Sequence, residues 1–217
     1  MLRAFRNLLR LIGIAHTLAR YDALFPADWL PATGGLVFAA RILSGFRTAR
    51  GISELRPGER LARALQDLGP SFIKFGQMLS TRPDLVGESI ANDLSTLQDA
   101  LPPFSSAEAR AAIETEFERP VTDMFEHFED APVAAASIAQ VHYARVAAPP
   151  DSPEDSLEVA VKVLRPGIEH AVERDLDLFR WIAGIVESTQ PRLRRLKPVV
   201  AVETFAESLR WEMDLRM

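Results

Sequence analysis

The local pattern of the sequence changes once, near residue 131, and this change limits the folds open to the chain. Before it, apolar residues recur at helical spacing in successive stretches. After it, residues 133–146 are small, β-branched and aromatic without a helical period, and residues 158–164 (EVAVKVL) alternate as a strand does. A two-stranded ribbon alone is only marginally stable, so the strands must continue into a small sheet packed on a helix. We therefore predict an α+β fold in which a helical extension precedes a small antiparallel sheet and long helices.

Spacing, prolines and capping signals predict the individual helices. We expect helices at residues 2–20, 34–46, from Pro57 to the break at Gly69-Pro70, and at 71–81, 87–98, 106–118, 121–128 and 168–189. Ser105 and Glu108 form a capping-box pattern before one of them. A last helix begins near residue 199, and no stop signal appears before Met217. Residues 147–157, which are rich in proline and acids, form a loop before the valine-rich strand.

The composition excludes several classes of protein. With 217 residues, 47% of them hydrophobic and 25% charged, the chain can bury a globular core. Its net charge of −5 argues against nucleic acid as a partner. There is no cysteine for disulfides or thiolate chemistry, and the four histidines do not sit at metal-ligand spacing. No run approaches the roughly 20 apolar residues that a membrane-spanning helix needs.

The helix expected at residues 2–20 has two interpretations. Apolar residues recur at helical spacing beside Arg3, Arg6 and Arg10, and no acid precedes Asp22. The helix either docks on the protein with a solvated basic edge or attaches to an anionic membrane surface. The acid-free, arginine-rich start also fits a mitochondrial transit peptide, although the usual serines are missing.

The segment AAASIAQV, residues 134–141, aligns with the phosphate loop of kinases, G-x-G-x-x-G-x-V, with alanines at the three glycine positions. Downstream, VAVK ends in Lys162 and matches the strand whose lysine holds nucleotide phosphates. Small residues let a backbone approach phosphates, and alanine, restricted to negative φ, makes a stiffer loop than glycine. The residues expected at the nucleotide are Ala134, Ala135, Ala136, Ser137, Ile138, Ala139, Val141 and Lys162.

Each half of this pattern also has a purely structural interpretation. An alanine-rich turn fits tight packing, and Lys162 alone fits an edge-strand lysine that discourages aggregation. The two halves occur in the kinase order and on predicted strands, which favours a nucleotide-binding kinase N-lobe.

Two further groups of polar residues lie on predicted helices. Lys74 and Gln77 are three residues apart and share a face. Gly76 beside them weakens the helix by about 1 kcal/mol, which predicts the close approach of another backbone. Glu212 and Asp214, two residues apart, point to different sides of the last helix. Without context, the first pair is a surface stripe and the second is a pair of solvated carboxylates.

Together these groups resemble the UbiB-type kinase-like family, also called the aarF-domain family. The resemblance covers nearly all of residues 55–217 and divides the chain into a helical segment (1–55), a K-x-G-Q extension (56–130) and a kinase-like N-lobe (131–217). The matching motifs are K-x-G-Q at Lys74, Gly76 and Gln77, the string AAASIAQVH from Ala134 to His142, and E-x-D at Glu212 and Asp214.

The resemblance implies an atypical kinase or ATPase that binds ATP or ADP with Mg²⁺ and supports ubiquinone biosynthesis. Its partners would be quinone-biosynthesis enzymes or lipid precursors. Lys162 would hold the phosphates and residues 134–139 would cover them. Lys74 and Gln77 would reach into the site, which has the E-x-D carboxylates nearby.

In the family pattern, several elements lie beyond Met217. They are the glutamate that pairs with the strand lysine, the catalytic loop, the metal-binding segment and the C-terminal membrane helices. Phosphoryl transfer needs those groups, so we expect the kinase C-lobe to be absent, no metal ligands within the chain, and no catalysis by it alone. The fragment would sit peripherally on the cytoplasmic side of a membrane, while full-length relatives would be anchored in the inner membrane.

Two rival functions remain. The first is a non-catalytic, membrane-associated scaffold or regulatory module of quinone biosynthesis. Direct hydroxylation of a polyprenylphenol is disfavoured, because no G-x-G-x-x-G fingerprint follows a strand and the histidines lack ligand spacing.

Overall fold

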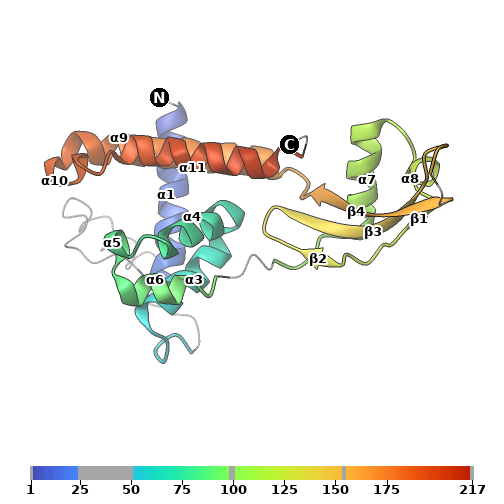
Figure 1. Cartoon of the computed structure of the whole chain (residues 1–217). Coiled ribbons are helices and arrows are strands. Elements are labelled where there is room, and N and C mark those ends of the chain that lie inside the picture. The colour runs from blue at the N-terminus through green and yellow to red at the C-terminus, as the bar shows by residue number, and fades with distance from the viewer. Residues whose placement is uncertain (1, 24–50, 98–100, 153–154, 216–217) are drawn as a thin grey trace. The chain divides into compact units, whose positions relative to one another are not determined.

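The computed structural model describes residues 2–23, 51–97, 101–152 and 155–215, which form two compact units (Figure 1). The helical unit comprises Met1–Gln98 with Val172–Leu209, and the sheet unit comprises Asp99–Ala171 with Arg210–Met217. The helix expected at residues 34–46 lies outside the described residues. The mixture of helices with a small antiparallel sheet confirms the predicted α+β class.

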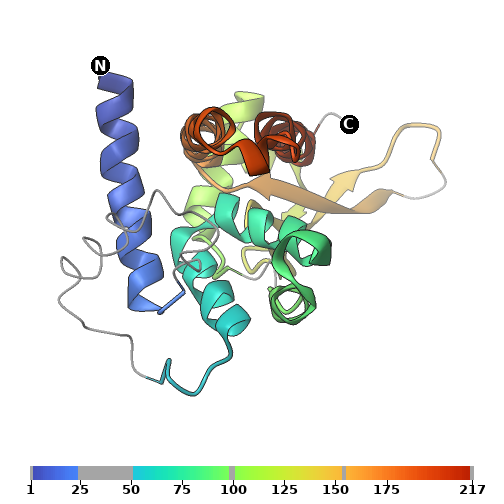
Figure 2. The same ribbon diagram turned by 90° about the vertical axis from the view of Figure 1, so that its left-hand side faces the viewer.

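The helical unit is built from two separate stretches of sequence. Its first stretch contains α1 (Leu2–Arg20), α3 (Pro57–Leu68), α4 (Pro70–Ser80), α5 (Pro83–Val86) and α6 (Glu88–Leu94). Its second stretch contains most of α9 (Ile168–Thr189) and of α11 (Pro198–Met213), with α10 (Pro191–Arg194) between them. α9 and α11 lie side by side, as both views show (Figures 1 and 2), and Arg180 Nε donates to Glu203 Oε1 across them at 2.8 Å.

Gly69 and Pro70 separate α3 from α4 as predicted. Gly69 has a φ of 104°, which favours glycine, and its N–H caps the carbonyls at the end of α3. Pro70 then occupies the first position of α4, where its missing N–H costs nothing.

An aromatic cluster joins the two stretches of the helical unit. The ring of Phe179 on α9 lies 5.1 Å from that of Phe72 and 5.4 Å from that of Phe75, both on α4. Phe205 on α11 lies 5.8 Å from Phe75, edge to face. Such aromatic pairs contribute about 0.5–1.5 kcal/mol each beyond the burial of their surface.

The sheet unit places a small sheet beside α7 (Ser106–Phe117) and α8 (Val121–Met124). The strands are β1 (His127–Phe128), β2 (Ala134–Ala135), β3 (Ala139–Ala147) and β4 (Ser156–Leu164), and all pairings are antiparallel. β3 is central: β4 pairs along one edge, and β1 and β2 pair with successive parts of the other edge. Ala144 and Val163 face the core, where Ile113 of α7 packs.

Several predicted boundaries are wrong for local reasons. The helix expected to reach residue 128 ends at Met124, because residues 127–128 pair with β3 and bury Phe128. The helix expected at 87–98 spans only Glu88–Leu94, and α5 precedes it across Gly87, whose φ is 85°. α10 was not expected. The last helix ends at Met213 rather than continuing to residue 217, and the N–H of Asp214 closes its final turn.

Candidate nucleotide-binding site

The start of the alanine-rich segment and the strand lysine flank the central strand of the sheet. Val141 on β3 pairs with Ala134 on one side and with Lys162 on the other. Directly opposed residues of antiparallel strands project from the same face, and neighbouring strands lie roughly 4.8 Å apart. Ala134, Val141 and Lys162 therefore form one row on the face of the sheet opposite the core, and Lys162 is exposed.

The turn between β2 and β3 is short and largely buried. The N–H of Ala136 donates to the carbonyl of Ala139 at 2.8 Å, which closes the turn. Ser137, Ile138 and Ala139 are each at most 3% exposed. Their side chains thus anchor the turn, and Ala134 at its start remains exposed.

Arg165, just after β4, holds the turn from its carbonyl side. Its backbone N–H donates to Ile138 at 2.8 Å, and its guanidinium donates to the carbonyls of Ser137 at 3.4 Å and Pro102 at 3.0 Å. Its Cζ also lies 5.3 Å from the ring centroid of Phe104, within the roughly 6 Å of a cation–π contact. Burial lowers the pKa of Arg165 from its usual value. These bonds fix the turn to the segment that leads into α7.

Gln140 and His142 brace the same strand from the core side, and sequence reasoning assigned neither a role. The Gln140 side chain accepts from the N–H of Phe104 at 3.1 Å and donates to its carbonyl at 3.3 Å. Gln140 Nε2 also lies 2.9 Å from His142 Nε2, and His142 Nδ1 lies 2.8 Å from the carbonyl of Glu129. This pattern assigns the Nδ1–H tautomer to a neutral His142. The available signal was two polar residues at alternate, inward-facing positions of a predicted strand.

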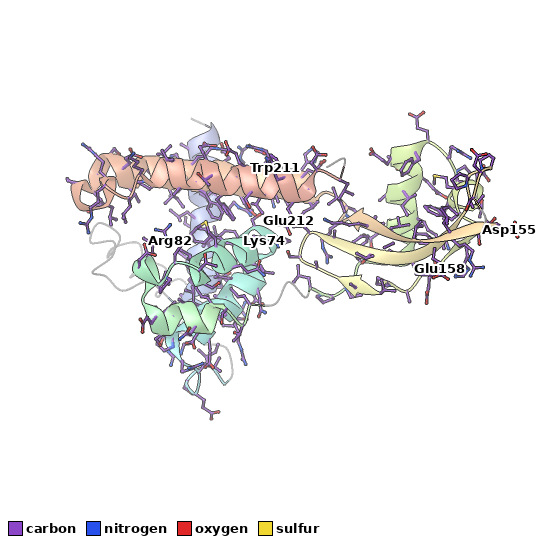
Figure 3. The ribbon with its side chains drawn as sticks, viewed as in Figure 1. Lys74, Arg82, Asp155, Glu158, Trp211 and Glu212 are labelled. Atoms are coloured by element: carbon purple, nitrogen blue, oxygen red, sulfur yellow. The ribbon has the colours of Figure 1, made fainter. Side chains whose placement is uncertain are left out.

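The E-x-D motif meets Lys162 through its backbone. Lys162 Nζ donates to the carbonyl oxygen of Glu212 at 3.4 Å. Glu212 lies in the last turn of α11, where Figure 3 labels it, and Asp214 follows the end of the helix. Both motif residues are half-buried. This hydrogen bond brings the E-x-D motif to Lys162. The acceptor is the backbone carbonyl of Glu212 and not its carboxylate.

The outward face of the sheet becomes more highly charged away from Lys162. Arg145 and Glu158 pair across β3 and β4. The hydrogen bond from Tyr143 to the Glu158 carboxylate is the main reason that the pKa of Tyr143 is raised. The small side chains and the lone ammonium are therefore confined to the end of the sheet that carries the turn.

The K-x-G-Q motif lies on α4 of the helical unit (Figure 3 labels Lys74). Gln77 Nε2 donates to the carbonyl of Leu97 at 3.2 Å. A Cβ at Gly76 would lie 2.4 Å from Leu97 Cδ1 and 2.7 Å from Leu65 Cδ1. The close approach predicted at Gly76 is thus made by leucine side chains and not by another backbone. The role expected of Lys74 and Gln77 at the nucleotide stays a prediction.

The described residues contain no group of three or more His, Asp or Glu side chains arranged to hold a metal ion. The row on the sheet suits phosphate: it offers one ammonium beside small side chains, and phosphate oxygens are natural acceptors for it. In the described part of the chain, no helix combines the length and apolarity needed to cross a bilayer.

Comparison with known proteins gives this geometry a context. Residues 96–217 match the ABC1 atypical kinase-like domain. That match covers more than half of the chain, so the chain belongs to the ABC1 atypical kinase-like family. It confirms the kinase-like character expected from the alanine-rich segment and the lysine strand.

Relatives named "Probable protein kinase UbiB" confirm the resemblance to the UbiB type. The chain is 39% identical to the one from Marinobacter nauticus over 212 residues, which are 97% of this chain and 37% of the relative. It is 40% identical to that of Aeromonas salmonicida over 98% of this chain and 37% of the relative. For Xylella fastidiosa the identity is 44% over 78% of this chain and 30% of the relative. The chain thus spans between 30% and 37% of the length of these relatives.

Proposed function

We propose that this chain carries the nucleotide-binding sheet of a UbiB-type atypical kinase or ATPase that supports ubiquinone biosynthesis. The row formed by Ala134, Val141 and Lys162 is the observation that supports this most directly. It puts the start of the alanine-rich turn and the strand ammonium on one face, as the kinase-like comparison leads us to expect.

In this proposal Lys162 binds the phosphates of ATP or ADP, and residues 134–139 cover them. The bonds from Arg165 and Gln140 hold the turn in shape before the nucleotide arrives, so little ordering entropy is lost on binding. Mg²⁺ would neutralise phosphate charge when it is bound with the nucleotide. We place its ligands and the phosphoryl-transfer residues in the part of the relatives that this chain does not span, and expect no catalysis from residues 1–217 alone.

The three-part division into residues 1–55, 56–130 and 131–217 is likewise proposed as a division into family modules, distinct from the two compact units. Lys74, Gln77, Glu212 and Asp214 are proposed to act at the same nucleotide. The phosphoryl acceptor would be a lipid precursor or a protein of quinone biosynthesis, met at the cytoplasmic side of a membrane.

A second candidate is a non-catalytic scaffold or regulatory module that docks on a membrane. The exposed apolar side chains of α1 favour it, because they offer a surface that the nucleotide site does not need. The two candidates differ in whether the chain binds nucleotide.

Thermal unfolding with MgATP or MgADP tests the nucleotide proposal. A ligand present at 100 times its Kd stabilises a protein by about 2.7 kcal/mol, which is readily seen as a rise in Tm. Lys162→Ala should lose most of this rise while keeping the Tm of the free protein, because the side chain is exposed. Lys197→Asn is the matched control: it removes the same charge from an exposed site where the φ of 48° suits asparagine.

An equal nucleotide-dependent rise in the wild type and in Lys162→Ala would remove Lys162 from the site. If the Tm of the wild type does not rise at a high nucleotide concentration, the chain does not bind nucleotide, and the scaffold candidate is favoured.

A further inference from the structure

α1 packs on the rest of the helical unit through the side that carries Asn7, Arg10, Ile14 and Leu18. Asn7 is buried, and its side-chain amide donates to Asp177 Oδ2 on α9 at 3.2 Å. Arg10 forms an ion pair with Asp175, whose side chain is 6% exposed. Further along the same face, Ile14 and Leu18 pack into the core of the helical unit. Arg10 is therefore turned inward, whereas Arg6 on the expected basic edge stays exposed.

The opposite side of α1 carries an apolar stripe that faces solvent. The stripe consists of Phe5, Leu8, Leu9 and Ile12, which are 61%, 39%, 54% and 39% exposed. Their spacing of i, i+3, i+4 and i+7 places them on one face over two helical turns. An amphipathic helix normally turns such a face toward the core. Four large apolar side chains held outward in a row indicate a surface that something covers.

The charge of α1 indicates what covers it. The helix carries Arg3, Arg6, Arg10 and Arg20 and no acid, although the whole chain has a net charge of −5. Arg6 stays 64% exposed even though it lies 3.6 Å from Asp177, and Arg20 is exposed. An apolar stripe flanked by exposed arginines is complementary to an anionic lipid surface, where apolar side chains insert and arginines meet headgroup phosphates.

We propose that α1 lies along an anionic membrane surface with the apolar stripe inserted at the boundary between headgroups and acyl chains. The contacts of Asn7 and Arg10 with α9 hold the helix so that the stripe already faces outward before it meets lipid. The stripe, and not the set of arginines as a whole, is then the main contact. This inference rests on the peripheral-membrane part of the proposed function and is independent of the nucleotide site.

Co-sedimentation of the full chain with vesicles tests the inference. The wild type should bind vesicles of mixed phosphatidylglycerol and phosphatidylcholine and bind pure phosphatidylcholine more weakly. The double variant Phe5→Ser/Leu9→Ser should reduce partitioning by about tenfold or more, because two large apolar side chains no longer insert. The control Ile185→Ser/Val200→Ser changes two exposed apolar residues on α9 and α11 and should bind as the wild type does.

A fluorescence measurement keeps the test independent of any loss of stability. Leu9→Trp should bind like the wild type, and its emission should shift to the blue on anionic vesicles, whereas Ile185→Trp should not shift. If the wild type binds vesicles and the stripe variant binds equally well, the stripe is not the contact and this inference fails alone.

Two other outcomes show whether lipid or a second copy of the chain covers the apolar stripe. If the wild type binds no vesicles, both the inference and the peripheral-membrane proposal fail, while the nucleotide-dependent rise in Tm stands or falls separately. If ultracentrifugation shows a dimer that Phe5→Ser/Leu9→Ser dissociates, and vesicles do not bind, a second copy covers the stripe and the lipid assignment is overturned.

Discussion

At the scale of single residues, Gly58 shows how closely two helices of the helical unit approach. A Cβ at this position would lie 2.4 Å from the Cβ and 2.7 Å from Oδ2 of Asp93. Asp93 is 1% exposed and lies 2.6 Å from Arg56, so it has little freedom to move away. The absence of a side chain at Gly58 is therefore what allows α3 and α6 to pack around this ion pair.

We expect Gly58→Ala to destabilise the chain by about 1–3 kcal/mol, the usual cost of overpacking a core. Gly184→Ala on α9 is the control, because a Cβ there meets nothing within 4 Å, and it should stabilise by up to about 1 kcal/mol through helix propensity. Urea denaturation of both variants measures the two changes. If Gly58→Ala leaves the free energy of unfolding unchanged, Asp93 can move away at little energetic cost.

At the scale of helices, α7 begins with the capping box that the sequence predicts. Ser105 Oγ accepts from the N–H of Glu108 at 3.3 Å, and Glu108 Oε2 accepts from both the hydroxyl and the N–H of Ser105. The bond from the Ser105 hydroxyl is the main reason that the pKa of Glu108 is lowered, and the backbone bond comes next. The carboxylate form of Glu108 is thus favoured by folding.

Ser105→Ala should cost about 1 kcal/mol at neutral pH, as the loss of an N-cap generally does. Because folding lowers the pKa of Glu108, its contribution is present above the unfolded pKa, near 4.5, and is lost as pH falls through the folded pKa. The difference in unfolding free energy between wild type and Ser105→Ala should therefore shrink below about pH 4. A difference that stays constant in urea titrations at pH 7 and pH 3 would rule out this linkage.

The aromatic contacts between α9 and α4 are made by the ring of Phe179. Phe179 contacts Phe72, Phe75 and Phe205, so its removal opens a cavity shared by three helices. We expect Phe179→Ala to destabilise the chain by about 3 kcal/mol, toward the low end for buried aromatics because Phe179 is only half-buried. Ile185→Ala on the same helix, 42% exposed, should change stability by less than about 1 kcal/mol. Equal effects of both variants on the urea midpoint would contradict this account.

At the scale of the whole molecule, much of the fold follows from local sequence signals. The order of the longer helices and of β3 and β4, the break at Gly69-Pro70 and the extent of α9 follow from periodicity and from residues with restricted φ. The row of Ala134, Val141 and Lys162 was accessible for the same reason, since β2 with β3 and β3 with β4 are antiparallel pairs of successive strands.

The features that sequence reasoning missed depend on distant partners. Spacing identifies the apolar face of α1 but not which face packs, because Asp175 and Asp177 lie more than 160 residues away. Residues 127–128 form a strand because they pair with the edge of β3. The local spacing of apolar residues carries no information on that pairing. Gln140 and His142 stabilise β3 through hydrogen bonds to the backbone of Phe104 and Glu129, which are distant in the sequence.

The helical unit is discontinuous in sequence, and this has a consequence for how the protein is made. Residues up to 98 leave the ribosome before Val172–Leu209 exist. At about 5–20 residues per second, Phe72 and Phe75 wait roughly 5 to 20 s for Phe179, and Arg10 waits roughly 8 to 33 s for Asp175. During that interval the nascent chain exposes the aromatic side chains that α9 and α11 later cover, and exposed apolar surface of this kind makes incomplete chains prone to aggregate.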